Sequence, residues 1–430
     1  MVQRSSDFLR FAGDVNIEKI NIKTTSGFSQ EITNQVIGIQ VFEDMFSPFT
    51  TGTIVIRDSL DLLNLFPLSG EEFLEIKIST PTLKTPIEGN FYIFKMADRE
   101  IIGDRTVVYE LHFITQEAVI DINKRISKAY SGKCSDIAKT LITDKEFGLQ
   151  IKKNINIEET KNSTKFISNF WNPVRCLNYL CDHSLNTNDS PSFVFFENRF
   201  GFNFASLETL YTNNDIIQHF VYDNYKRDNL PGPGGETAVN PSEQYKRIKE
   251  IRIPTVFDYM SNTSNGMYAS KQYTFDITTK TVFINNFDLK TDFEKQKHLN
   301  KNAPVSANAI YRPSALVIVK PSYYGSFTNE KDVTNASFLQ KRISLMRQAD
   351  ANKIEITVPG RTDYTVGQKV IVDLERMETM KPNEKNTQDG VLSGAYLIGA
   401  INHYIDREKH ECVIELFKDS MLKDLNGKAK

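Results

Sequence analysis

The chain has 430 residues, of which 40% are hydrophobic and 25% are charged, and this composition excludes a disordered or fibrous protein. Its 52 Lys and Arg residues nearly balance its 54 Asp and Glu residues, so the net charge of −2 argues against a dedicated nucleic-acid-binding protein. The length predicts about two to four domains. Because no run of about 18 apolar residues and no N-terminal apolar segment of signal-peptide length occurs, we expect neither a membrane span nor secretion.

The first part of the chain has the pattern of β-structure. Apolar and polar residues alternate over 74–78 and again over 109–113, and alternation with period two is typical of strands that have one buried face. Between the first strands, "RDSLDLLNLFPLSG" at 57–70 predicts a short helical turn. We therefore expect an antiparallel barrel or sandwich over about 12–116, within a first domain of residues 1–116.

Residues 117–227 are expected to form a mixed α+β domain. In "SGKCSDIAKTLI", Ser135 has the position of a helix N-cap. In "NPVRCLNYLCDHS", Asn172 can cap a second helix and Pro173 suits its first turn. The following "PSFVFFENRFGFNF" predicts a hairpin that turns near Asn198.

A Pro- and Gly-rich stretch at 228–243 predicts the clearest loop in the chain. Strands resume after this loop, and we place the start of a second β-barrel domain over 228–284. Within it, "TSNGMYAS" contains Asn265 and Gly266, a strong turn signal. The two residues are expected to form an ordinary surface turn or, alternatively, a contact loop in an assembly.

The last third of the chain completes this second domain. Residues 285–335 are polar and are predicted to be an insertion. Residues 336–430 predict a helix and the remaining strands of the second barrel; in the helix, Leu339, Ile343 and Met346 recur at helical spacing and predict a buried stripe. The predicted fold class is β-rich α+β, with two antiparallel β-barrel domains, an intervening mixed α+β domain and insertions.

The stretch "GRTDYTVGQKVIVDL" at 360–374 invites interpretation as a phosphate site, because a glycine loop lies beside Lys369. A phosphate loop needs Gly-x4-Gly-Lys followed by Ser or Thr, and here Lys369 lies two places after Gly367 and is followed by valine. We therefore predict structural turns instead. Gly360 ends one strand, and Gly367 supplies the backbone angle with which the chain enters the next.

No catalytic residue, cofactor site or metal site is predicted. Cys176, Cys181 and His183 are the best metal candidates, but Cys181 would lie about 140° round a helix from Cys176, at roughly 100° per residue. No second cluster completes a tetrahedral site, and the nucleophile-elbow motif Gly-x-Ser-x-Gly is absent. The four cysteines are expected to be free thiols. The six histidines are expected at the surface or at interfaces: His112, His183, His219, His298, His403 and His410.

The C-terminal block, "GRTDYTVGQKVIVDL" followed by "SGAYLIGAINHYIDREKHECVIELFKDS", resembles the end of the contractile-tail hub proteins. These are the central baseplate hub of T-even-like phages, the late-control protein of other contractile phages and the related type VI secretion spike proteins. "FEDMFSPFTTGTIVIRDSLDLLNLFPLSGEEFLEIKI" also resembles their first domain. "TSNGMYASKQYTFDITTK" is similar to a stretch in hub proteins of large T-even-like phages.

The resemblance implies a homotrimer in which each chain gives two tube-forming barrel domains, so that three chains make a ring of pseudo-sixfold symmetry. Such a ring joins the sixfold tail tube to the threefold central spike. The implied partners are tail tube and tube-initiator proteins, the spike protein and neighbouring baseplate proteins. The implied location is the tail baseplate of the virion, after assembly in the host cytoplasm. DNA would pass transiently without specific binding, which a near-neutral charge suits.

Two alternatives remain beside a structural hub. One is a tail-associated cell-wall hydrolase whose active site the motifs do not reveal, and the other is a type VI secretion-type spike component. The missing nucleophile, metal and phosphate motifs favour the hub over the hydrolase. No repetitive β-helix follows "ELFKDSMLKDLNGKAK", so we expect the spike to be a separate chain, which disfavours the second alternative.

Overall fold

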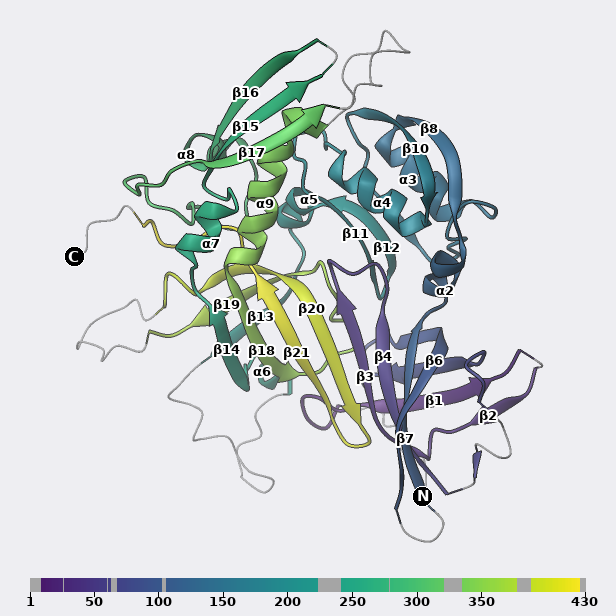
Figure 1. Ribbon diagram of the computed structural model, residues 1–430. Coiled ribbons are helices and arrows are strands. Elements are labelled where there is room, and N and C mark those ends of the chain that lie inside the picture. Colours follow the sequence, from purple (N-terminus) through teal and green to yellow (C-terminus); the bar gives the residue numbers. More distant parts are fainter. Residues whose placement is uncertain are drawn as a thin grey trace, which may run out of the picture.

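Figure 1 shows the computed structural model, which describes residues 9–25, 27–59, 61–62, 68–102, 106–222, 241–277, 279–320, 335–376 and 388–425. A 13-stranded sheet dominates it and is accompanied by three smaller sheets. The predicted β-rich α+β class is confirmed. Residues 60 and 63–67 of the predicted helical turn at 57–70, and residues 228–240 of the predicted loop at 228–243, lie outside the described residues.

The N-terminal strands form one half of the large sheet, in the order β3-β4-β7-β6-β5-β1-β2. The pairs are antiparallel, and alternate side chains point into a common core that includes Ile54, Leu74 and Tyr109. Period-two alternation therefore predicted these strands correctly. Their bounds are β1 (Asn16–Lys23), β2 (Ser29–Glu31), β3 (Val36–Asp44), β4 (Thr51–Asp58), β5 (Phe73–Ser79), β6 (Ile87–Ile101) and β7 (Val107–Thr115).

Six strands from the second half of the chain nearly close on themselves. They run in the order β14-β18-β21-β20-β19-β13, and an isolated bridge between Val221 and Arg247 brings β13 back beside the segment that leads into β14. A separate core fills this block. The strand bounds are β13 (Ile216–Tyr222), β14 (Glu250–Thr255), β18 (Lys353–Pro359), β19 (Lys369–Leu374), β20 (Gly394–Asp406) and β21 (His410–Phe417).

Strand β20 makes one continuous sheet of the two β blocks. Its first residues pair with β19, and its residues from Ala400 to Asp406 pair with β3 of the first block. Ile401 accordingly packs in the second core and Ile405 in the first. The two predicted β blocks are therefore distinct in their cores but share a single sheet.

The middle part of the chain combines two small sheets with short helices. The predicted hairpin is present as β11 and β12, which pair in register up to Asn198 and Gly201. The elements are α2 (Gln116–Asn123), β8 (Ile126–Lys133), α3 (Cys134–Thr143), β9 (Ile155–Ile157), β10 (Ser163–Trp171), α4 (Pro173–Asp182), β11 (Phe193–Asn198), β12 (Gly201–Ser206) and α5 (Leu207–Thr212).

The predicted N-cap position is wrong for α3 and correct for α4, although the Asn172 side chain makes no capping hydrogen bond. Helix α3 begins at Cys134, so Ser135 lies inside its first turn, where its main-chain N–H donates to Thr160. Asn172 does hold the N-cap position of α4, but the Asp121 carboxylate accepts the Val174 N–H at 2.8 Å instead. A residue distant in sequence thus supplies the cap, which local sequence rules do not detect.

The third of the smaller sheets, which we call the third sheet, has the order β16-β15-β17 and stands away from the large one (Figure 1). Strand β17 pairs parallel with β15, so the predicted insertion at 285–335 contributes a strand to this sheet. No described helix combines the length and the apolar character needed to cross a membrane. The remaining elements are α6 (Pro241–Gln244), α7 (Tyr259–Ser264), β15 (Ala269–Asp276), β16 (Thr281–Asp288), α8 (Leu289–Asp292), η2 (Phe293–Lys295), β17 (Ser314–Lys320), η3 (Asn335–Ser337) and α9 (Leu339–Ala351).

Helix α9 lies between the third sheet and the large sheet (Figure 1). Its predicted stripe of Leu339, Ile343 and Met346 is only half-buried. Its buried face instead carries polar side chains, and the Gln340 amide donates to the main-chain carbonyl of Ser270 at 2.9 Å. The same buried face includes Leu345 and Ala349, and Ala349 packs in the core of the second block, so hydrogen bonds and apolar contacts together hold the helix.

Candidate functional site

Residues 360–367, the junction loop, lead from β18 to β19 and contact the first β block. Thr362 and Thr80 bind each other reciprocally: each main-chain N–H donates to the hydroxyl of the other, at 3.0 and 3.3 Å. Within the loop, the Arg361 guanidinium pairs with the Asp363 carboxylate, with Nε 2.9 Å from Oδ1. The stretch that suggested a phosphate site therefore joins two parts of the fold.

Glu43, on β3, reaches the same loop from the first block. Its carboxylate accepts hydrogen bonds from the Thr365 hydroxyl and, at 3.2 Å, from the Val366 N–H. The second carboxylate oxygen has no hydrogen-bond partner among the described residues. Burial raises the pKa of Glu43 to about 7, against the opposing effects of the Arg199 charge and of these hydrogen bonds.

Arg199, at the turn between β11 and β12, brings the middle part of the chain to this junction. Its guanidinium donates to the carbonyls of Pro86 at 2.7 Å and Thr85 at 3.3 Å, and its main-chain N–H donates to the Thr365 hydroxyl at 3.1 Å. Burial lowers the pKa of Arg199, while the negative charge of Glu43 opposes this shift. All three parts of the chain therefore meet around the junction loop.

A second polar contact fixes the first block to the middle part. Glu197 accepts hydrogen bonds from the Thr50 N–H at 2.9 Å and from the Thr115 hydroxyl at 2.6 Å, and it pairs with the Lys153 ammonium. A cavity of about 730 Å³ lies beside these contacts. Its lining carries acidic and basic side chains: Glu43, Lys84, Glu88, Glu117, Lys152, Lys153, Glu197 and Arg199.

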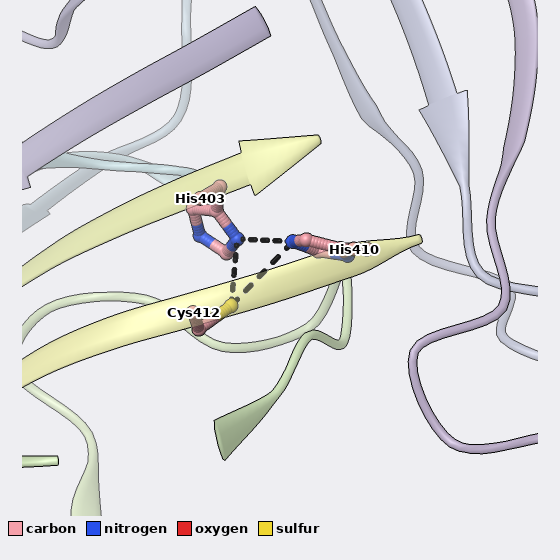
Figure 2. A group of neighbouring side chains, drawn as sticks. All are labelled: His403, His410 and Cys412. Carbon is pink, nitrogen blue, oxygen red and sulfur yellow. Dashed lines mark hydrogen bonds between the residues drawn. The ribbon is translucent and has the colours of Figure 1, made fainter. Parts of the chain in front are cut away.

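Strands β20 and β21 bring His403, His410 and Cys412 together inside the sheet (Figure 2). His403 lies directly opposite Cys412, and His410 lies two residues before Cys412 on the same face of the hairpin. The His403 Nδ1 atom is 3.0 Å from His410 Nε2 and 3.3 Å from Cys412 Sγ, and Sγ is 3.5 Å from His410 Nε2. We call these three side chains the His–Cys cluster.

The cluster corrects the expected surface location of His403 and His410, because both side chains are fully buried. Strand alternation places them on the inner face together with Ile401 and Ile405. Burial lowers the pKa of both imidazoles, that of His410 to about 3, so that both rings are neutral near pH 7.

Two glycines hold the main chain of His410. Its N–H donates to the Gly13 carbonyl at 2.8 Å, and its carbonyl accepts the Gly360 N–H at 2.8 Å. A Cβ atom on Gly360 would lie 2.3 Å from the His410 ring, and one on Gly13 would lie 2.7 Å from the His410 carbonyl oxygen. Close approach, rather than an unusual backbone angle, therefore requires glycine at position 360.

The other predicted turn residues lie in different surroundings. Gly367 has φ of +83°, and Gly266 has φ of +77°. Asn265 is the C-cap of α7, so Asn265 and Gly266 form the turn that ends this helix. A Cβ atom on Gly266 would lie 2.7 Å from the Ser314 hydroxyl oxygen, so this glycine permits close packing as well.

Replacing Gly367 with alanine is expected to lower the free energy of unfolding by about 1–2 kcal/mol, because φ of +83° disfavours a Cβ atom. The new Cβ would also lie 3.1 Å from the Phe196 ring. Gly27→Ala carries a similar backbone cost, because Gly27 has φ of +90°, but its added Cβ has no heavy atom within 4 Å, so the difference between the two variants measures the Phe196 contact. Urea unfolding measures both variants, and a Gly367→Ala protein as stable as the parent would contradict the expectation.

The side chains considered for phosphate or metal binding have structural contacts. The Lys369 ammonium donates to the main-chain carbonyls of Tyr211 at 3.0 Å and Asn213 at 3.1 Å, at the end of α5. Cys176 and Cys181 are buried on α4, and the His183 ring stacks on Tyr179. All four cysteines of the chain are free.

Sequence patterns did not identify the junction, because Glu43, Arg199 and Thr365 come from three distant parts of the chain. A signal for the His–Cys cluster was present, however. The strand "ECVIELF" alternates with Cys412 on its apolar face, and the preceding strand has His403 on its own buried face. Hairpin register then brings these residues together.

No protein-family model matches the chain. The probable baseplate hub protein gp334 of Vibrio phage KVP40 is 20% identical over 422 residues, covering 94% of each chain. A tail protein from Neisseria meningitidis MC58 has the same fold at 12% identity, with a TM-score of 0.54 over 93% of this chain and 96% of that one. The 43 kDa tail protein of prophage MuSo2 from Shewanella oneidensis is also 12% identical. It has a TM-score of 0.55 over 93% of this chain and 98% of that one. As the sequence motifs indicated, the chain resembles a phage baseplate hub protein along nearly its whole length and has the fold of tail proteins.

Proposed function

We propose that this chain is a structural baseplate hub of a contractile phage tail and has no catalytic activity. The observation that carries the proposal is the likeness to a baseplate hub protein over 94% of both chains. The shared fold with two tail proteins supports it. The chain would act in the tail baseplate of the virion after assembly in the host cytoplasm. Its partners would be the tail tube and tube-initiator proteins, the central spike and neighbouring baseplate proteins.

In this proposal three chains form a ring that joins the sixfold tube to the threefold spike. The proposed first barrel domain is 1–116 and the mixed domain is 117–227, while the second barrel domain begins at 228, contains an insertion at 285–335 and ends with 336–430. Strand β13, at the end of the proposed mixed domain, also joins the second block through its pairing with β19. Two β blocks in each chain would give six in a trimer, as a sixfold tube requires. Because β20 pairs with both blocks, their relative orientation is fixed within each chain, which suits an adaptor ring.

An apolar face on the third sheet supports assembly with other chains. Strand register places Phe275 between Val282 and Val319, and Tyr273 between Ile284 and Val317, so that six large side chains form two adjacent rows. Five of them are exposed in the single chain: Phe275, Val282, Ile284, Val317 and Val319. A contiguous exposed apolar face of this kind is typical of a surface that another protein covers.

The balance of charge supports DNA passage without specific binding. With 52 basic and 54 acidic residues, the chain lacks the basic excess that holds DNA through its phosphates. A channel through a ring of three such chains would therefore retain DNA weakly.

The purified chain is expected to have a mass of about 148 kDa in solution, three times the 49.2 kDa of one chain. Light scattering over a range of protein concentrations and native mass spectrometry measure it. An image of the assembled baseplate then tests for a threefold ring. A strict monomer at high concentration, together with a baseplate that lacks such a ring, would overturn the proposal.

The charged cavity gives the hydrolase alternative a specific test. Burial raises the pKa of Glu117, and Glu197 lines the same cavity, so a pair of carboxyl groups is available there. We expect no turnover of purified peptidoglycan by the chain. Robust turnover that Glu117→Gln abolishes would establish the hydrolase instead. The comparisons do not favour the type VI alternative.

A further inference from the structure

The atoms of the His–Cys cluster have the spacing of metal ligands. Around a tetrahedral zinc ion, with Zn–N of about 2.0–2.1 Å and Zn–S of about 2.3 Å, two nitrogens lie about 3.3 Å apart and a nitrogen and a sulfur about 3.6 Å apart. In the cluster, the nitrogen–nitrogen distance is 3.0 Å and the two nitrogen–sulfur distances are 3.3 and 3.5 Å. Shifts of a few tenths of an ångström would therefore fit the three atoms around one ion.

The hairpin register, rather than chance proximity, produces this triangle. His403 and Cys412 are cross-strand partners, and His410 lies on the same face as Cys412 because side chains alternate along a strand. Among the described residues, His403, His410 and Cys412 are the three His, Cys, Asp or Glu side chains whose potential ligand atoms all lie within 4.8 Å of one another. Figure 2 shows the three side chains directed toward one another from the two strands.

Hydrogen bonding alone does not account for the arrangement. Two neutral imidazoles that face each other through one nitrogen each can use only one proton between those nitrogens. At least one ring N–H therefore points away from the cluster. Of the two imidazoles, His403 has a weak hydrogen bond with the main chain of Tyr364, whereas the outward Nδ1 atom of His410 is buried and has no hydrogen-bond partner within the described residues. The cluster is thus an incompletely satisfied network, which is costly in a core.

We propose that His403, His410 and Cys412 bind one zinc ion through His403 Nδ1, His410 Nε2 and Cys412 Sγ. Two neutral imidazoles and one thiolate form a nitrogen and sulfur set that suits zinc. Binding converts the Cys412 thiol to a thiolate and releases its proton to the solvent, while no electron is transferred. His403, His410 and Cys412 form no recognised sequence motif for a metal site. The proposal is independent of the hub function.

The position of the site indicates a structural role. Cys412 packs in the core of the second block, and the neighbouring Ile405 packs in the core of the first. The main chain of His410 is bonded to Gly13 and Gly360, so an ion here would connect the hairpin, the N-terminal segment and the junction loop. All three ligand side chains are fully buried, so a large substrate has no access to the ion, and a small ligand such as water would take the fourth tetrahedral position.

The test uses the purified full-length chain, incubated with zinc sulfate and then separated from unbound metal by gel filtration. Inductively coupled plasma mass spectrometry is expected to find about one zinc per chain. Cys412→Ala should reduce this at least tenfold. Cys181→Ala is the matched control, because Cys181 is also a buried thiol but lies on α4, outside the cluster, and this variant should retain the zinc.

Cobalt gives a second, spectroscopic measurement. The parent chain loaded with Co²⁺ should show a thiolate-to-cobalt charge-transfer band and the intense visible bands of tetrahedral cobalt, and Cys412→Ala should lack the charge-transfer band. Less than a tenth of a zinc per folded parent chain, or unchanged zinc in Cys412→Ala, would overturn the proposal. Copper bound in preference to zinc, and lost in Cys412→Ala, would overturn the assignment to zinc.

Discussion

Gly360→Ala is expected to lower the free energy of unfolding by about 3 kcal/mol, at the upper end of the usual cost of overpacking. The added Cβ would lie 2.3 Å from two ring carbons of His410. This ring has little freedom to retreat, because its main chain is hydrogen-bonded on both sides and its Nε2 atom lies 3.0 Å from His403. The effect is steric, since Gly360 is not among the glycines with positive φ.

Gly38→Ala provides the matched control for this variant. Gly38 also lies beside the β20–β21 hairpin, but the nearest atom to its added Cβ is the Ile405 carbonyl oxygen at the ordinary distance of 3.7 Å. The free energy of unfolding of Gly38→Ala should stay within about 0.5 kcal/mol of that of the parent. Urea unfolding followed by circular dichroism measures both variants, and equal midpoints for the two would contradict the steric explanation.

The strands were predictable because a single local rule determines them. The alternation of Leu74, Ile76 and Ile78 identifies a strand and its buried face without any knowledge of the partner strand. The shared sheet was not predictable in this way. The partner strands of β20 depend on long-range register. Ile401 packs in one core and Ile405 in the other, and the apolar pattern does not distinguish the two.

Helix α9 shows how an apolar pattern can indicate the wrong face. Leu339, Ile343 and Met346 have helical spacing, yet the fully buried side includes Gln340 and Ser344. The hydroxyl of Ser344 donates to the Met267 carbonyl at 2.6 Å, a partner 77 residues away in sequence. Periodicity alone treats a polar residue as exposed, whereas here its hydrogen-bond partner makes burial favourable.

The candidate site was only partly predictable, for the same reason. Gly360 and Gly367 were recognised as structural from their places between strands, but what Gly360 approaches is His410, 50 residues later. Glu43 and Arg199 carry no local signal, because a charged residue in a strand or turn is normally solvated. Their burial follows from the meeting of three parts of the chain, which only the tertiary structure defines.

Glu43→Gln is expected to make the protein progressively more stable than the parent as the pH rises from about 5 to 8. Burial raises the pKa of Glu43 from 4.5 to about 7 in the folded state. The folded parent therefore holds a proton that the unfolded chain releases above pH 4.5. The stability that this proton contributes is fully present below pH 4.5 and is lost as the pH rises through 7. This rise in the pKa of Glu43 corresponds to a loss of about 3 kcal/mol in the free energy of unfolding of the parent over this pH range.

Glutamine preserves the geometry while removing the titration. Its carbonyl oxygen can accept from the Thr365 hydroxyl and the Val366 N–H, as the carboxylate does, and its amide replaces an oxygen that has no partner among the described residues. Lys418 contributes with the opposite sign, because burial lowers its pKa to about 7, so stability gained from it rises with pH. Since parent and variant both contain Lys418, the difference between their free energies of unfolding at each pH gives the contribution of Glu43 alone.

Glu75→Gln is the control for charge removal as such. Hydrogen bonds from Lys23 and Lys19 lower the pKa of Glu75 to about 2, so its contribution is lost only as the pH falls from 4.5 toward 2. The difference between Glu75→Gln and the parent should therefore stay constant from pH 5 to 8, while that for Glu43→Gln widens. Urea unfolding at intervals across this range measures both. Parallel curves for the parent and Glu43→Gln would mean that the carboxyl group at the junction is not held in its neutral form, and that the Arg199 charge offsets the cost of its burial.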